Sequence, residues 1–86
     1  MNLKKQLKMI YRVYVNFKSG ILDPEAEAIK KTIINMGFKS LKNLSKGKFF
    51  DIEIKNNSDG LKEIEKISRD LLSNPVIENF KITKKN

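Results

Sequence analysis

Two segments of the chain alternate apolar and polar residues with a period of two. The first carries its apolar residues at Tyr11, Val13, Val15 and Phe17, and the second at Phe50, Ile52 and Ile54. Because successive side chains of a strand point to opposite faces, each segment is predicted to be a half-buried β-strand. Phe80 and Ile82 indicate a further strand near the C-terminus, with Glu78 on the same face. A carboxylate on the apolar face of a strand predicts either a β-bulge or a position at an interface.

Two other segments repeat apolar residues at the spacing of an amphipathic helix. The first begins with Asp23, a good N-cap, and Pro24, which suits the first helical position, and it ends before Gly37, a C′ glycine. Its apolar stripe consists of Ala26, Ile29, Ile33 and Met36. The second helix is predicted to be capped by Ser58 or Asp59 and to stop at Asn74-Pro75. Its apolar positions are Leu61, Ile64, Ile67, Leu71 and Leu72.

Residues 39–46 carry no clear pattern, because Leu41 and Leu44 are three positions apart, and Gly47-Lys48 is predicted to form a turn after them. With this segment as a strand, the element order is β-α-β-β-α-β. That order predicts an α+β, two-layer sandwich with a four-stranded antiparallel sheet and both helices on one face. The other face would expose Tyr14 and Phe49, which favours association with further copies.

The chain has 86 residues and a formal net charge of +8, from 18 Lys and Arg against 10 Asp and Glu. Residues 1–8 and 81–86 each carry three lysines and no acid, so the body of the domain is close to neutral. We expect a basic N-terminal tail or start-site extension over 1–8, a domain over 9–83 that opens at Met9, and a short tail over 84–86. Clustered charge is what binds phosphates. Lysines at two separate ends of the chain therefore indicate solvated surface charge rather than a nucleic-acid-binding site.

The residue inventory leaves little room for catalysis. With no Cys and no His, the chain has no disulfide, no thiol nucleophile, no Ser-His-Asp triad and no zinc site of the usual kind. No phosphate-loop motif occurs, and the Asp and Glu residues are predicted to be solvated. No catalytic, cofactor-binding or metal-binding residue is predicted. The lack of an apolar run of membrane-spanning length and of a signal segment favours a cytoplasmic protein.

Three runs of sequence together resemble the PurS family, the small subunit of phosphoribosylformylglycinamidine (FGAM) synthase. They are the Leu22-Asp23-Pro24 turn after the first strand, Gly47-Lys48 before the second, and residues 71–78 (LLSNPVIE), which are the most specific. The resemblance covers about residues 10–83. The family often has Gly soon after Asp-Pro, where this chain has Ala26, and Arg before Gly-Lys, where it has Ser45-Lys46.

This resemblance implies a non-catalytic subunit of a ligase complex. The complex converts formylglycinamide ribonucleotide to its amidine with ATP, Mg²⁺ and glutamine in purine biosynthesis. The implied partners are further copies, as a homodimer or tetramer, a glutaminase (PurQ-like) subunit and a synthetase (PurL-like) subunit, between which ammonia passes. Neither nucleic acid nor a membrane is an expected partner. The residues predicted to shape interface loops are Asp23, Pro24, Gly47, Lys48, Asn74, Pro75 and Glu78.

Two other functions remain open at this point. One is a small RNA-binding module of similar topology, motivated by the basic balance and by Phe49 and Phe50. The other is a regulatory domain that senses a small molecule, which rests on analogy of fold alone.

Overall fold

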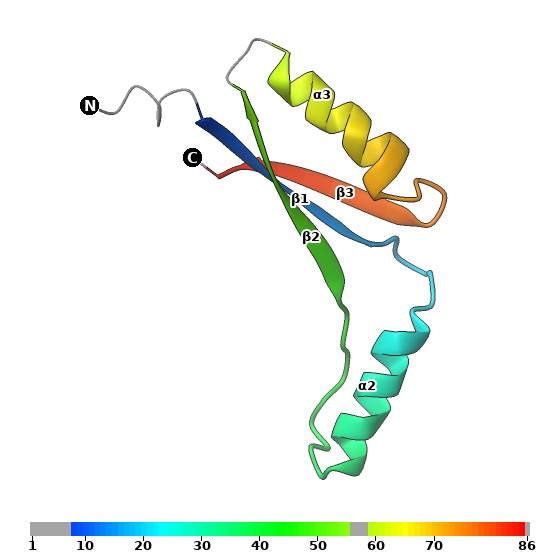
Figure 1. Cartoon of the computed structure of the whole chain (residues 1–86). Coiled ribbons are helices and arrows are strands. Elements are labelled where there is room, and N and C mark those ends of the chain that lie inside the picture. The colour runs from blue at the N-terminus through cyan, green and yellow to red at the C-terminus, as the bar shows by residue number, and fades with distance from the viewer. Residues whose placement is uncertain (1–7, 56–58, 86) are drawn as a thin grey trace, which may run out of the picture.

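The computed structural model describes residues 8–55 and 59–85 of the chain. The elements follow one another as β1 (Lys8–Phe17), α2 (Pro24–Asn35), β2 (Gly47–Lys55), α3 (Gly60–Ile67), a π-helical turn η1 (Ser68–Leu72) and β3 (Glu78–Lys84). Figure 1 shows α3 lying over the sheet and α2 projecting away from it. Of the predicted N-terminal tail, only Lys8 lies among the described residues, as the start of β1.

The three strands form one antiparallel sheet in the order β2-β1-β3. The register places Val13 between Phe50 and Ile82, and Val15 next to Phe80, so the apolar rows of all three strands share one face. Ile64 of α3 is fully buried against this inner face. The core therefore lies between α3 and the inner face of the sheet, as the alternating pattern requires.

The predicted fourth strand is wrong. Residues 41–46 are extended but belong to no strand, and β2 pairs directly with β1. The predicted turn at Gly47-Lys48 is also wrong, because both residues are the first of β2. Without alternation, residues 39–46 cannot direct one apolar face toward a core.

The helix between β1 and β2 does not cover the sheet, so the prediction of two helices on one face is wrong. We call residues 21–46 the arm: a loop, α2, and the extended segment that returns to β2 beside it (Figure 1). The radius of gyration is 17.5 Å, against about 12 Å for a compact chain of this length. Of the apolar stripe of α2, Ala26 is buried and Ile33 half-buried, whereas Ile29 and Met36 are exposed.

The predicted ends of the first helix are confirmed. Asp23 is the N-cap of α2 and Pro24 the first helical residue, while Gly37 has φ +105°, a conformation that favours glycine. Asp59 occupies the N-cap position of α3 without a side-chain capping hydrogen bond, so only its position is confirmed, and Ser58 lies outside the described residues. The predicted second helix divides into α3 and the π-helical turn, where the buried Ser68 donates from Oγ to the Ile64 carbonyl at 2.7 Å.

Candidate functional site

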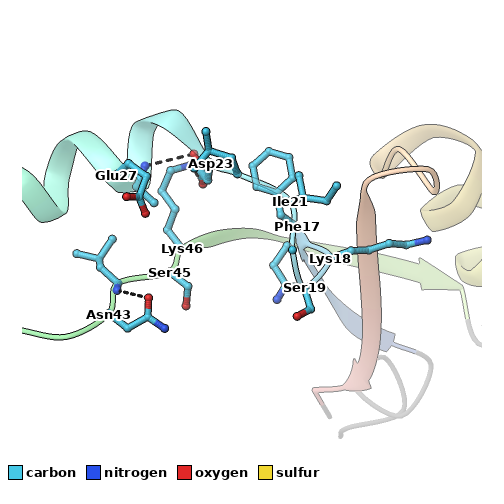
Figure 2. Close-up of a pocket in the computed structure, with 14 residues that line it drawn as sticks. Phe17, Lys18, Ser19, Ile21, Asp23, Glu27, Asn43, Ser45 and Lys46 are labelled. Carbon is cyan, nitrogen blue, oxygen red and sulfur yellow. Dashed lines mark hydrogen bonds and ion pairs between the residues drawn. The ribbon is translucent and has the colours of Figure 1, made fainter.

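The base of the arm is held by charged groups. Asp23 Oδ1 accepts hydrogen bonds from the Glu25 and Ala26 backbone N–H groups at 3.0 and 3.2 Å. Lys46, just before β2, brings its Nζ to 2.9 Å from Glu25 Oε1 and 3.3 Å from Asp23 Oδ2. Figure 2 shows the Lys46 side chain reaching from the segment before β2 toward the start of α2. The two ends of the arm are thus joined by one lysine.

These contacts shift the pKa values of the residues that make them. Burial alone would raise the pKa of the Asp23 carboxyl, but the Ala26 N–H and the Lys46 ammonium hold it below its ordinary value. The pKa of Lys46 is raised, first by its hydrogen bond to Glu25 and then by Asp23. Asp23 Oδ2 is buried and makes no well-directed hydrogen bond, so the Lys46 ammonium is its counter-charge. Asp23 and Lys46 are therefore both charged at neutral pH.

Four of the seven predicted site residues line one small cavity beside this cluster. The cavity has a volume of about 210 Å³ and lies where the arm meets the strands. Its predicted members are Asp23, Gly47, Lys48 and Glu78. A second cavity of about 370 Å³, drawn in Figure 2, lies between the loop after β1 and the segment before β2. We call Asp23, Glu25, Lys46, Gly47 and Lys48 the arm junction.

Gly47 is required at the junction for a steric reason. A Cβ atom at this position would lie 2.7 Å from the Val15 carbonyl oxygen and 3.1 Å from Asn16 Cβ. Neither a backbone oxygen nor the paired strand can move aside cheaply at that separation. The glycine therefore lets the start of β2 lie close against β1.

Pro24 begins α2, whereas Asn74, Pro75 and Glu78 belong to the turn between the π-helical turn and β3. Asn74 Oδ1 accepts from Val76 N–H at 3.1 Å, and Glu78 Oε1 accepts from Asn74 N–H at 2.7 Å. Pro75 is exposed at the tip. The predicted bulge at Glu78 is wrong: Glu78 pairs with Phe17 in unbroken register, and its carboxylate closes the turn. The turn also meets the loop after β1, because Lys18 N–H donates to the Ile77 carbonyl at 2.8 Å.

Sequence reasoning missed Lys46 and Arg12. Arg12 makes a bidentate ion pair with Asp51, at 2.7 and 2.9 Å, and its guanidinium lies 4.0 Å from the centre of the Phe49 ring. Both residues read as ordinary surface cations, because their partners are far away in the sequence. The Arg12–Asp51 pair could have been found only from the strand register.

The described residues offer neither a cluster of metal ligands nor a membrane-spanning helix. Within residues 8–55 and 59–85, no group of three or more potential ligands could hold a metal ion. In the same part of the chain, no helix has the length and apolar character to cross a membrane. The junction fixes where the arm leaves the sheet. Within it, Asp23, Glu25 and Lys46 are paired to one another and to the backbone of α2.

The described residues thus form a small α+β domain, a three-stranded antiparallel sheet with one helix over it and a second helix held away from it at an ion-paired junction (Figure 1). The family model described as PurS, phosphoribosylformylglycinamidine (FGAM) synthase, matches residues 10–86. The chain therefore belongs to the PurS family of FGAM synthase subunits.

Relatives and solved structures agree with this assignment. The phosphoribosylformylglycinamidine synthase subunit PurS of Archaeoglobus fulgidus is 41% identical over 76 residues, covering 86% of this chain and 95% of the relative. The crystal structure of Methanocaldococcus jannaschii PurS is 29% identical, with a TM-score of 0.80 over 91% of this chain and 96% of that one. A chain in the structure of PurLQS from Thermotoga maritima has the same fold, with a TM-score of 0.79 at 24% identity over 91% and 98% of the two chains. The comparisons do not favour the RNA-binding alternative.

Proposed function

We propose that this chain joins the glutaminase and synthetase subunits of FGAM synthase and assists ammonia transfer between them. Membership of the PurS family over residues 10–86 carries the proposal. It is supported by the fold shared with a chain of PurLQS from Thermotoga maritima. ATP and Mg²⁺ would be used by the complex at the synthetase subunit, and the complex would act in the cytoplasm.

The arm supports self-association as part of this function. An isolated helix of 12 residues is marginally stable in water, because its own hydrogen bonds barely offset the loss of chain entropy. Packing of an apolar face normally supplies the rest, yet Ile29 is 41% and Met36 68% exposed. Phe38, just beyond the helix, is 60% exposed. A second copy that covers this stripe would supply the missing packing, and a two-fold axis would cover both arms at once.

The predicted interface residues fit a supporting role in that assembly. Asp23 and Pro24 start α2, while Gly47 and Lys48 start β2 beside the arm. Asn74, Pro75 and Glu78 order the turn that meets the loop after β1. On this proposal, they set the direction of the arm and the shape of the loops rather than carry the main contact area. A dimer, or a tetramer made from two dimers, is the proposed form.

Reconstitution tests the function directly. The purified chain is combined with the glutaminase and synthetase subunits of the same organism, and FGAM formation is followed with glutamine or with ammonium chloride as nitrogen donor. We expect glutamine-dependent synthesis only when all three chains are present, while ammonia-dependent synthesis by the synthetase persists without this chain. Equal glutamine-dependent turnover in its absence would contradict the proposal.

A further inference from the structure

The sheet face opposite α3, which we call the outer face, has an ordered pattern of side chains. Three rows cross the strands: Phe49–Tyr14–Lys81, then Asp51–Arg12–Thr83, then Glu53 beside Ile10. The middle row is fixed by the bidentate Arg12–Asp51 pair, and Arg12 lies over the Phe49 ring. Tyr14 and Phe49 have ring centres 6.2 Å apart and are 41% and 53% exposed. Aromatic and arginine side chains held in this way are typical of residues that dominate binding energy at interfaces.

One end of the outer face is a basic depression. A cavity of about 450 Å³ is lined by both aromatic residues and by three lysines, with no carboxylate among its lining residues. Its lysines are Lys46, Lys48 and Lys81. Lys46 is paired with the acids of the arm junction, whereas Lys81 is exposed beside Tyr14. Lys48 pairs with Val15, and its Nζ lies 5.8 Å from the centre of the Phe50 ring, on the inner side of the sheet. The depression therefore offers an apolar floor with the Lys81 ammonium at its rim on the outer face.

We infer that the outer face docks a protein partner through a segment that inserts an apolar side chain with a carboxylate beside it. This inference rests on the proposed function, and the partner is one of the two larger subunits. Apolar contact with Tyr14 and Phe49 would supply affinity, and a carboxylate near Lys81 would supply orientation. The arm remains available for a second copy, because its apolar stripe lies on α2, off the sheet (Figure 1).

The charges on the outer face decide between possible occupants. The described side chains of this face include four cations, Arg12, Lys55, Lys81 and Lys85, and two carboxylates, Asp51 and Glu53. A second copy lying face to face would bring like charges together, which disfavours self-association here. A nucleic-acid strand running across the face would leave the basic depression and meet Asp51 and Glu53. A protein segment with a carboxylate beside its apolar side chain matches the depression without extending over those acids.

Binding measurements with purified subunits test this inference. The glutaminase and synthetase subunits are immobilised in turn, and the affinities of wild type, Lys81→Glu, Phe49→Ala and the control Lys62→Glu are compared. Lys62 is an exposed lysine on α3. We expect Lys81→Glu to weaken binding to one subunit about 10-fold, with a smaller ratio at high salt, and Phe49→Ala to weaken it about 10- to 30-fold. Lys62→Glu should change it less than about 2-fold.

Folding and self-association are measured on the same variants, by circular dichroism and sedimentation. Folded variants of unchanged oligomeric state with weaker partner binding support the inference. Equal binding by wild type, Lys81→Glu and Phe49→Ala overturns it while leaving the proposed function intact. Loss of self-association in Lys81→Glu would show that a second copy occupies the face, and RNA binding lost in that variant with partner binding intact would show a nucleic-acid site. Failure of wild type to bind either subunit would overturn the proposed function and this inference together.

Discussion

Substitution of Met36 by Ser should weaken self-association. Met36 lies at the C-cap of α2, in line with Ile29 and Ile33, so the change removes apolar surface without placing a poor helix former inside the helix. The side chain is 68% exposed in one chain, which is the part that a second copy can cover. If two copies associate through this stripe, the single substitution Met36→Ser therefore causes a measurable loss of dimer stability.

The expected size follows from that exposed fraction. Full burial of a methionine side chain contributes about 2 kcal/mol, so covering the exposed two thirds contributes about 1.4 kcal/mol per chain. A two-fold interface contains the residue twice, which brings the loss to about 3 kcal/mol per dimer. This corresponds to an increase of about 100-fold in the dimer Kd.

Sedimentation velocity over a dilution series measures that Kd for wild type and variant. Lys31→Ser is the matched control, because Lys31 is an exposed residue of α2 on the side away from the apolar stripe. It should leave the Kd within about 2-fold of wild type. A Met36→Ser Kd equal to that of wild type, or a wild type that stays monomeric at every concentration, would refute the assignment of the arm to self-association.

Three further substitutions test the fold. Ile64→Ala should lower the free energy of unfolding by about 2–5 kcal/mol in urea titrations, because Ile64 is fully buried in the core. Gly47→Ala should cost about 1–3 kcal/mol in the same assay, since its Cβ would lie 2.7 Å from the Val15 carbonyl oxygen; a neutral effect would mean that the strands can separate there. The hydrogen bond from Arg12 lowers the pKa of Asp51, so the stability this group adds is complete above its unfolded pKa, near 4, and is lost as pH falls through the lower folded value. The free energy of unfolding of Asp51→Asn should therefore fall less than that of wild type as the pH drops below about 4. An equal fall in both proteins would contradict a contribution from the Arg12–Asp51 pair.

Local sequence signals predicted the elements that depend on neighbouring residues. Alternation from Tyr11 to Phe17 and from Phe50 to Ile54 gave the inner face of β1 and β2, and Asp23-Pro24 gave the start of α2. These features need only a period or a cap, and both are written in consecutive residues.

The position of the arm could not be read from the sequence in the same way. The stripe of Ala26, Ile29, Ile33 and Met36 requires some apolar cover, but its spacing is identical whether its own sheet or another chain supplies it. The failure at residues 39–46 has the same origin, because a fourth strand was needed only to complete a self-contained sandwich. Lys46 was one lysine among 16 until the fold placed it beside Asp23 and Glu25.

Residues 46–48 belong to both proposed surfaces, and this has a physical consequence. Lys46, Gly47 and Lys48 line the cavity at the arm junction and also the basic depression of the outer face. Lys46 holds the base of the arm through Glu25 and Asp23, so a carboxylate that enters the depression competes with those acids for one ammonium group. Partner docking and the direction of the arm therefore both depend on the Lys46 ammonium group. Replacement of Lys46 should consequently affect self-association and partner binding together, whereas Met36 and Lys81 substitutions should each affect only one.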